Sequence, residues 1–316
     1  MKRCVSRFLC LWLAAAASPL VAQTTQQAAT LETLTSQIES ATAKRQWAEA
    51  IVLGQKVLAI EEAVSGTNDP EVAGTLTLIA GWMRELDRNV EAEALLRRAL
   101  MVFETSYGGA HEYTISAANN LAATLEALGR LEDANKIYSL TLDNMVKLHG
   151  PSHRLTAMST NNLAFNLARQ GRYQEAQPLY DKALKIGRAT MDDDDPERAR
   201  IENNVASNLT ARGRYLQAEP LYNHALKTRL AVLGPDDADV ATSYNSLAFN
   251  LSAQGRHEDA APLFARALAI RQKANSEDRR AATSYNNVAH NLNARGRPIE
   301  AAPLYARALS IWHKLY

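Results

Sequence analysis

The fold is decided by residues 161–186, NNLAFNLARQGRYQEAQPLYDKALKI. Apolar and small side chains recur there at helical spacing on both sides of Gly171, at Leu163, Ala164, Leu167, Ala176, Leu179, Tyr180, Ala183 and Leu184. Glycine commonly ends a helix because it adopts the left-handed backbone conformation without a Cβ penalty. The stretch therefore predicts two helices joined by a short turn, the first over about residues 155–169 and the second over about 174–189.

The same pattern returns along nearly the whole chain. The turn glycines are 42, 42, 42 and 41 residues apart, at Gly129, Gly171, Gly213, Gly255 and Gly296, and the same spacing leads back to Asp87 and Arg45. An alanine follows each of these points five residues later, at Ala50, Ala92, Ala134, Ala176, Ala218, Ala260 and Ala301. A fixed period of this length is the signature of a solenoid built from repeated supersecondary units.

No segment alternates polar and apolar residues over a strand's length, so we expect an all-α chain. It is expected to contain about seven helix-turn-helix repeats, near residues 30–66, 67–107, 108–149, 150–191, 192–233, 234–275 and 276–316. Four prolines share one position, which we expect near the start of the second helix, where a missing N–H costs least: Pro178, Pro220, Pro262 and Pro303.

These residues resemble the tetratricopeptide repeat family, in which a Leu and a small residue in the first helix precede Ala-x3-aromatic in the second. Leu163-Ala164, Ala176 and Tyr180 match this pattern, although the family's Trp position is Thr160 and the period is 42 rather than 34. The longer period is similar to that of kinesin light chains. The resemblance implies a right-handed superhelix over residues 30–316, whose first helices line a concave groove that holds an extended peptide.

The first twenty-two residues have the pattern of a secretory signal peptide. An apolar run over residues 8–17 follows three basic residues, Lys2, Arg3 and Arg7, and the small Ala22 marks the expected cleavage position. An uncleaved anchor is the alternative, but this run is shorter than the roughly 20 residues of a membrane-spanning helix. We therefore expect a periplasmic or secreted protein with no membrane span in the mature chain and a flexible leader over residues 23–29.

The composition excludes several classes of function. The chain has 35 basic and 34 acidic residues, which gives no electrostatic basis for binding nucleic acid. Both cysteines, Cys4 and Cys10, lie in the signal segment, so the mature chain is expected to have no disulfide and no thiolate site. The sequence has no phosphate loop, no His-Glu-x-x-His motif and no serine elbow. We therefore expect no enzymatic activity and no cofactor.

The candidate peptide-binding residues lie on the first helices. One asparagine precedes each recurring Leu or Val by two residues, at Asn119, Asn161, Asn203, Asn245 and Asn286. A row of amides can pair with the N–H and C=O groups of a peptide. The position four residues later varies, at Ala123, Phe165, Ser207, Phe249 and His290. We expect Phe165 and Phe249 to be the apolar anchors, with His290 in the same groove.

A structural role for the asparagines is the alternative. Two further rows occur, at Asn120, Asn162, Asn204 and Asn287 and at Asn166, Asn208, Asn250 and Asn291. A helix with 3.6 residues per turn cannot present all three rows to one ligand. Buried amides can instead link neighbouring repeats. We assign the ligand to the first row and leave the linking role open.

Three other features have a structural interpretation. The run Asp192–Asp195 lacks the oxygen spacing and terminal Glu of a calcium loop, so we expect it to charge a helix N-terminus. His149 and His153 have no third ligand in view, so no metal is predicted. An arginine follows each turn glycine, where it can cap the preceding helix or pair with an acid of the next repeat, at Arg130, Arg172, Arg214, Arg256 and Arg297.

The sequence as a whole favours an exported non-catalytic scaffold that binds a peptide segment of a partner protein in its concave groove. A structural assembly module acting through its ends and convex face is the first alternative, and groove binding of a polysaccharide is the second. The last helix, over residues 299–316, has an apolar stripe and no polar capping helix after it: Leu304, Ala308, Ile311 and Leu315, with Trp312 beside them. Terminal repeats normally need such a cap. We therefore expect a homodimer through this helix.

Overall fold

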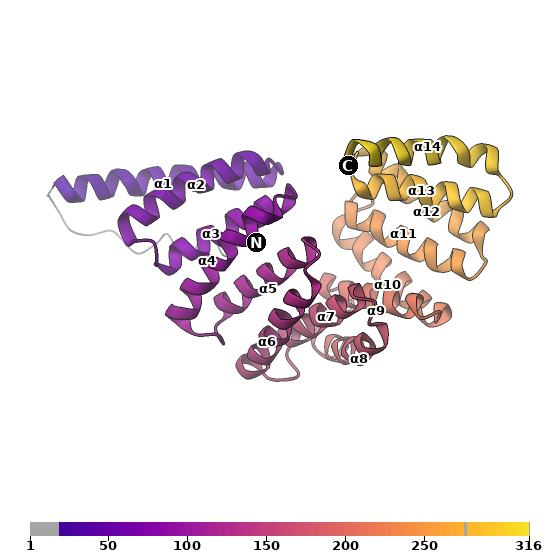
Figure 1. Ribbon diagram of the computed structural model, residues 1–316, viewed down its shortest axis with the longest axis horizontal. Coiled ribbons are helices and arrows are strands. Elements are labelled where there is room, and N and C mark those ends of the chain that lie inside the picture. The colour runs from indigo at the N-terminus through magenta and orange to yellow at the C-terminus, as the bar shows by residue number, and fades with distance from the viewer. Residues whose placement is uncertain (1–18, 275–276, 316) are drawn as a thin grey trace. The chain divides into compact units, whose positions relative to one another are not determined.

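A computed structural model describes residues 19–274 and 277–315, which form fourteen α-helices and no strand (Figure 1). In chain order these are α1 (Pro19–Ala43), α2 (Trp47–Ser65), α3 (Pro70–Glu85), α4 (Asn89–Tyr107), α5 (Glu112–Ala127), α6 (Leu131–His149), α7 (Arg154–Arg169), α8 (Tyr173–Thr190), α9 (Pro196–Ala211), α10 (Tyr215–Leu233), α11 (Ala238–Ala253), α12 (His257–Lys273), α13 (Arg279–Ala294) and α14 (Pro298–Leu315). Six of the seven expected repeats each enclose one helix pair, and the first pair begins before residue 30. The predicted helices around Gly171 agree with α7 and α8 to within one residue at each end.

The first helix differs from its prediction. Helix α1 already includes residues 23–29, so the structure has a helix where the sequence predicts a flexible leader. The position after Ala22, where cleavage is expected, lies within this helix. Most of the predicted signal peptide, residues 1–18, lies outside the described residues.

The chain divides after Gly150 into two compact units. The described part of the first unit holds α1–α6 and that of the second holds α7–α14. In the second unit the first helices of successive pairs, α7, α9, α11 and α13, contact one another, and α3 contacts α5 in the first unit. The second helices of successive pairs make no comparable contacts. The first helices therefore form the inner side of each stack.

The repeating alanine is buried in every helix pair. All seven, Ala50, Ala92, Ala134, Ala176, Ala218, Ala260 and Ala301, are at most 1% exposed. A methyl group is the smallest side chain that still fills the contact, and a larger one would force the neighbouring helices to move. The aromatic side chain four residues later packs into the same core, as Tyr180 and Tyr222 do in the second unit.

The turn between the helices of a pair requires a left-handed backbone. The five predicted glycines have φ between 72° and 80° there. Arg45 and Asp87 occupy the same position in the first two pairs with φ of 56°. A side chain with a Cβ atom in this conformation costs about 1 kcal/mol. The first unit therefore contains two strained turns that the glycine-containing pairs avoid.

The prolines lie deeper in their helices than predicted. Pro178 is the sixth residue of α8 and Pro220 the sixth of α10, and Pro262 and Pro303 hold the same place in α12 and α14. Only the first four N–H groups of a helix lack an internal acceptor, so each proline removes an interior hydrogen bond. The expectation that these prolines replace a free donor of the first turn is therefore wrong.

The apolar stripe of the last helix is largely part of the chain's own core. Ala308 and Ile311 are fully buried and Leu304 is half-buried. Among the stripe residues, only Leu315 is exposed, at 45%. The other large apolar side chains of α14 that are exposed are Ile299, Tyr305 and Leu309. The predicted dimer surface is thus wrong in its residues, because α14 turns most of the stripe toward its own unit.

Glu61 on α2 is an acidic residue at a mostly buried position. Burial raises its pKa from 4.5 to about 7, and the nearby carboxylates of Glu71, Asp69 and Glu62 act in the same direction, against a hydrogen bond to Thr75. The Oε2 atom of Glu61 is buried and has no hydrogen-bond partner within the part of the chain that the structure describes. Because the folded-state pKa exceeds the ordinary value, the contribution of Glu61 to stability is fully present below pH 4.5 and is lost as the pH rises through about 7.

Asp87→Gly is expected to raise the free energy of unfolding by about 0.5–1 kcal/mol, because it removes the Cβ conflict in a left-handed turn. Gly171→Ala introduces the same conflict and should lower it by about 1 kcal/mol. Gly74→Ala is the control, since an added Cβ on α3 meets open space, and it should cause no loss. Urea unfolding followed by circular dichroism measures all three variants. A loss of stability in Asp87→Gly would contradict the conclusion that the turn at Asp87 is strained.

Glu61→Gln is expected to stabilise the protein by about 1–2 kcal/mol at pH 8 and to have little effect at pH 5, allowing for partial solvent exposure of the carboxyl group. The variant cannot acquire the buried charge that develops in the wild type as the pH rises. Glu49→Gln, at an exposed position of the same helix, is the control and should give no pH-dependent gain. Urea unfolding at the two pH values measures this, and an equal effect at both would rule out titration of Glu61.

Candidate functional site

Four exposed side chains lie at equivalent positions of the first helices of the second unit. Phe165 on α7 is 38% exposed and Phe249 on α11 is 57% exposed. Ser207 on α9 and His290 on α13 are also exposed. Large aromatic side chains are mostly buried in soluble proteins, so these phenylalanines are not explained by the core. We call Phe165, Ser207, Phe249 and His290 the exposed row.

The first predicted asparagine row is only partly available to a ligand. Asn161 is 0% exposed, and its Oδ1 accepts a hydrogen bond from Nδ2 of Asn204 in the next pair, at 3.2 Å. A buried side chain that links two pairs cannot touch a ligand in this structure, so the prediction for Asn161 is wrong. Asn245 also links pairs, because its Nδ2 donates to Oγ of Ser284 at 2.9 Å.

The remaining asparagines of that row lie close to the surface. Asn203 and Asn286 in the second unit and Asn119 in the first unit are half-buried. The Oδ1 atom of Asn119 accepts a hydrogen bond from Oγ1 of Thr141 at 3.3 Å. The Oδ1 atoms of Asn203 and Asn245 are buried and have no donor among the described residues. A peptide-binding role for Asn119, Asn203, Asn245 and Asn286 stays a prediction.

The third asparagine row connects neighbouring helices inside the stack. Nδ2 of Asn250 donates to Oγ1 of Thr210 on α9 at 2.9 Å, and Nδ2 of Asn291 donates to the carbonyl oxygen of His257 at 2.9 Å. Nδ2 of Asn208 donates to Oε1 of Gln177 at 2.8 Å. These three asparagines are at most 2% exposed. The structural interpretation is therefore the correct one for them.

In five helix pairs the arginine after the turn forms an ion pair with an acid three residues later. Arg172 donates to both carboxylate oxygens of Glu175, at 2.8 and 2.7 Å. The same ion pair joins Arg88 to Glu91, Arg130 to Asp133, Arg256 to Asp259 and Arg297 to Glu300. Arg130 and Arg256 also reach an acid of the preceding second helix, Glu93 and Glu219.

Arg214 departs from this pattern. Three residues later the chain has Gln217, and the position on the preceding second helix is Gln177. Neither side chain is charged, and Arg214 has no ion pair or hydrogen bond through its side chain among the described residues. The sequence alone could have indicated the unpaired arginine, because Gln217 replaces an acid that every other helix pair has at the same position.

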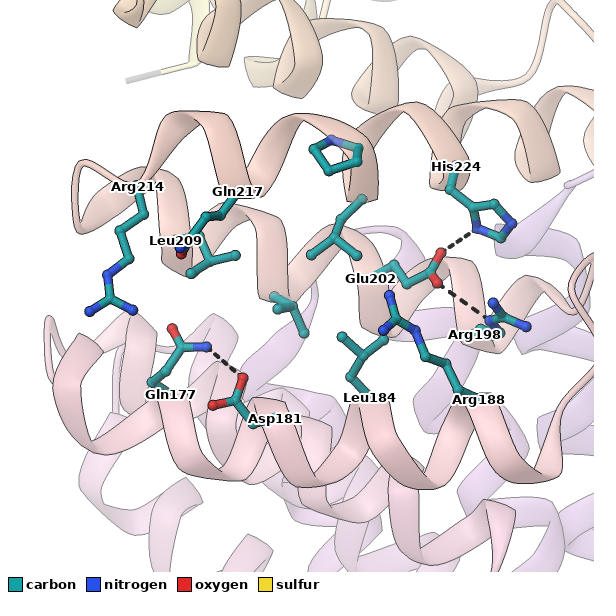
Figure 2. A pocket seen from close by; sticks show the side chains of 13 residues that line it. Gln177, Asp181, Leu184, Arg188, Arg198, Glu202, Leu209, Arg214, Gln217 and His224 are labelled. Atoms are coloured by element: carbon teal, nitrogen blue, oxygen red, sulfur yellow. Dashed lines mark hydrogen bonds and ion pairs between the residues drawn. The ribbon is translucent and has the colours of Figure 1, made fainter.

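A cavity of about 490 Å³ opens beside Arg214 in the second unit, lined by side chains of α8, α9 and α10 (Figure 2). Its apolar lining side chains are Leu184, Val205, Leu209, Pro220 and Leu221, and the carboxylate of Asp181 also lies between the two ends in Figure 2. Figure 2 shows Arg214 and Gln177 toward one end and Arg188, Arg198 and His224 toward the other. No pattern in the sequence predicts this cavity.

A buried carboxylate organises the second end of the cavity. Glu202 is 1% exposed and pairs with Nε of Arg198 at 3.3 Å and with Nδ1 of His224. Asp193 pairs with the same two residues, at 2.7 Å to Arg198 and 3.2 Å to Nε2 of His224. Burial opposes the charged imidazole, but its hydrogen bonds to Glu202 and Asp193 outweigh burial and raise the pKa of His224. The hydrogen bond from His224 lowers the pKa of Asp193.

The other polar features have structural partners. Asp195 accepts a hydrogen bond from the Glu197 N–H at 2.8 Å, which confirms that the aspartate run supplies charge at a helix start. His153 caps α7 in the same way, at 3.3 Å to the N–H of Leu155. Within residues 19–274 and 277–315, no group of three or more His, Cys, Asp or Glu is placed to hold a metal ion. No helix of that part is both long and apolar enough to cross a membrane.

Asn250→Ala is expected to lower the free energy of unfolding by about 1–3 kcal/mol, because it removes a buried amide that bonds to Thr210 and Gln254. Asn223→Ala is the matched control on the exposed side of α10, and its effect should stay within about 0.5 kcal/mol. Thermal and urea unfolding measure both variants. Equal stability of the two would show that the buried amide does not hold the stack.

Comparison with protein families and solved structures agrees with this fold. A tetratricopeptide repeat family model matches residues 72–145, 113–189, 155–229 and 197–273, and a second tetratricopeptide repeat model matches residues 281–316. The comparison with curated proteins finds no match.

Three solved structures illustrate the similarity. BtubC (BKLC) from P. vanneervenii is 24% identical, with a TM-score of 0.57 over 73% of this chain and 91% of that one. The nearly identical TPR-like repeats of a Podosopora anserina protein described as a kinesin light chain are 20% identical, with a TM-score of 0.54 over 65% and 97%. The Rap conjugation gene regulator of plasmid pLS20, in complex with the Phr* peptide, is 14% identical, with a TM-score of 0.67 over 97% and 81%. The family matches and these folds confirm the predicted solenoid with its long, kinesin-light-chain-like repeat: the chain belongs to the tetratricopeptide repeat family.

Proposed function

We propose that this chain is an exported, non-catalytic scaffold that binds an extended peptide segment of a partner protein on the first-helix face of its second unit. The observation behind this proposal is the exposed row. Phe165 and Phe249 are accessible on the inner side of a stack whose core is already filled by other side chains. Exposed aromatic side chains on a rigid surface are typical anchors of a protein interface.

The amides beside the exposed row support a peptide ligand. The Oδ1 atoms of Asn203 and Asn245 are hydrogen-bond acceptors that receive no donor from residues 19–274 or 277–315. An unpaired buried acceptor costs free energy, and a backbone N–H of a peptide is a suitable donor if the asparagine side chains turn toward the surface. The variation from Phe to Ser to Phe to His along the row would then select particular side chains of the partner.

The fold similarity is compatible with this proposal. The Rap regulator described above was solved in complex with a peptide, so a stack of this fold can hold one. At 14% identity the comparison does not extend to particular residues of this chain. The peptide proposal therefore depends on the exposed row itself.

The proposal also includes export and a homodimer, both of which rest on the sequence. The basic and apolar start of the chain supports export, with the mature protein expected to begin at Gln23. A homodimer through α14 would use the exposed Leu309 and Leu315 rather than the buried Ile311. Assembly through the second helices or the ends, without a peptide in the first-helix face, remains the competing function.

Replacing Phe165 and Phe249 together with Ala is expected to reduce capture of the native partner about tenfold or more, because both anchors are lost. The measurement is quantitative mass spectrometry of proteins captured from the exported fraction, where the same data report the mature N-terminus. Leu216→Ala is the matched control, since Leu216 is 78% exposed on α10. Both variants should retain their helical circular dichroism.

The competing functions predict different outcomes. Unchanged capture by the Phe165 and Phe249 variant, with loss in Leu216→Ala, would place the partner on the second helices and contradict the peptide proposal. Displacement of the partner by polysaccharide fragments, but not by peptides from its own sequence, would favour saccharide recognition.

A further inference from the structure

The cavity between α8, α9 and α10 contains charges that the repeat pattern normally neutralises. In the pairs with a paired arginine after the turn, an acid three residues later accepts from that arginine. At the cavity, glutamines take the places of both acids that could pair with Arg214. Its guanidinium group therefore has unused donors at the edge of an open cavity.

Arg188 supplies a second unpaired cation. It lines the same cavity from α8, and its side chain has no ion pair or hydrogen bond among the described residues. Figure 2 shows no interaction line from Arg188 or Arg214, whereas Arg198 and His224 are joined to Glu202. The acids of that end are thus already engaged by Arg198 and His224. The remaining lining carboxylate, Asp181, accepts a hydrogen bond from Gln177.

The two unpaired arginines are separated along the cavity. Arg214 lies near Gln177 in Figure 2, and Arg188 follows Gln177 by eleven residues on the same helix, α8. At 1.5 Å of rise per residue, the backbone positions of Gln177 and Arg188 are roughly 16 Å apart along α8. An extended peptide covers that distance in about five residues, at roughly 3.3 Å each. Leu209, Asp181 and Leu184 lie between the two ends in Figure 2, and Val205, Pro220 and Leu221 also line the cavity.

We propose that this cavity is a second binding site, which takes an acidic peptide segment with two carboxylates on one face of the extended chain, about four to six residues apart, and apolar side chains between them. Each carboxylate would accept paired hydrogen bonds from one guanidinium group. The apolar side chains would cover Leu184, Leu209 and Leu221. This site does not rest on the proposed function of the exposed row, because it is built by a different set of residues that includes two second helices.

Charge complementarity favours a peptide over other occupants. A fatty acid has an apolar chain but only one carboxylate, so it would leave one arginine unpaired. A polysaccharide would place hydroxyl groups against the apolar middle and leave them without partners. A peptide with acids on both sides of apolar residues satisfies both ends and the middle at once.

The test uses the full mature chain and a fluorescein-labelled synthetic peptide with glutamates at positions one and seven, which share a face of an extended chain, and leucine and alanine between them. Fluorescence anisotropy measures binding to the wild type, to the double variant Arg188→Gln and Arg214→Gln, and to Arg256→Gln. Arg256 is the matched control because it holds the position of Arg214 in the next pair but is already paired with Asp259 and Glu219. A peptide with lysines in place of the glutamates and the fatty acid dodecanoate are the comparison ligands.

The wild type and Arg256→Gln are expected to bind the acidic peptide equally, and the double variant about tenfold more weakly, because two charge-assisted contacts are lost. The lysine peptide should not bind, and the Phe165 and Phe249 variant should bind the acidic peptide as the wild type does. Equal binding by the double variant and the wild type would overturn the proposal. So would a preference for dodecanoate, binding of the lysine peptide as tight as that of the acidic one, or no binding of the acidic peptide at millimolar concentration.

Discussion

The close approach of helices at the repeating alanine is the constraint on which the stack depends. At every one of the seven positions only a methyl group stands in the contact, and it is fully or almost fully buried. Such close packing leaves little freedom for neighbouring side chains, because each must fill a space of fixed shape. Amides can then bridge adjacent elements at hydrogen-bond distance, as Asn250 does with Thr210 and Asn291 with the backbone of His257.

This constraint separates residues that build the stack from those that remain free to bind. Asn161 and Asn250 are buried and link neighbouring helices inside the stack. Phe165 and Phe249, which share one position of the repeat, are exposed. A similar separation holds for the arginines. Arg172 and Arg256 are neutralised by their helix partners, and Arg214 is not. A side chain that lacks the partner found in the other repeats is therefore a candidate for binding a ligand.

The sequence predicted the helix pairs because their signals are local. Gly171 fixes the turn through its own backbone conformation, and Ala176 fixes the contact through its size. The role of Asn161 was not predictable in the same way, since its neighbours Asn162 and Asn166 have the same chemistry and only packing against the next pair decides which is buried. Pro178 was misplaced because sequence position does not define where α8 begins. The cavity was not predicted because side chains of three helices form it, and their packing cannot be read from the sequence. The uncharged Gln217 indicated only that Arg214 lacks its usual acidic partner.

Close packing at the repeating alanines brings neighbouring pairs near enough for buried amides to link them, and these links stabilise the stack without a bound partner. A double-mutant cycle between Asn250 and Thr210, measured by urea unfolding of the isolated protein, tests this claim most directly. The cycle compares Asn250→Ala, Thr210→Val and the double variant with the wild type. We expect a coupling energy of about 1 kcal/mol, as for a buried hydrogen bond between neighbours. A coupling energy indistinguishable from zero would contradict the claim.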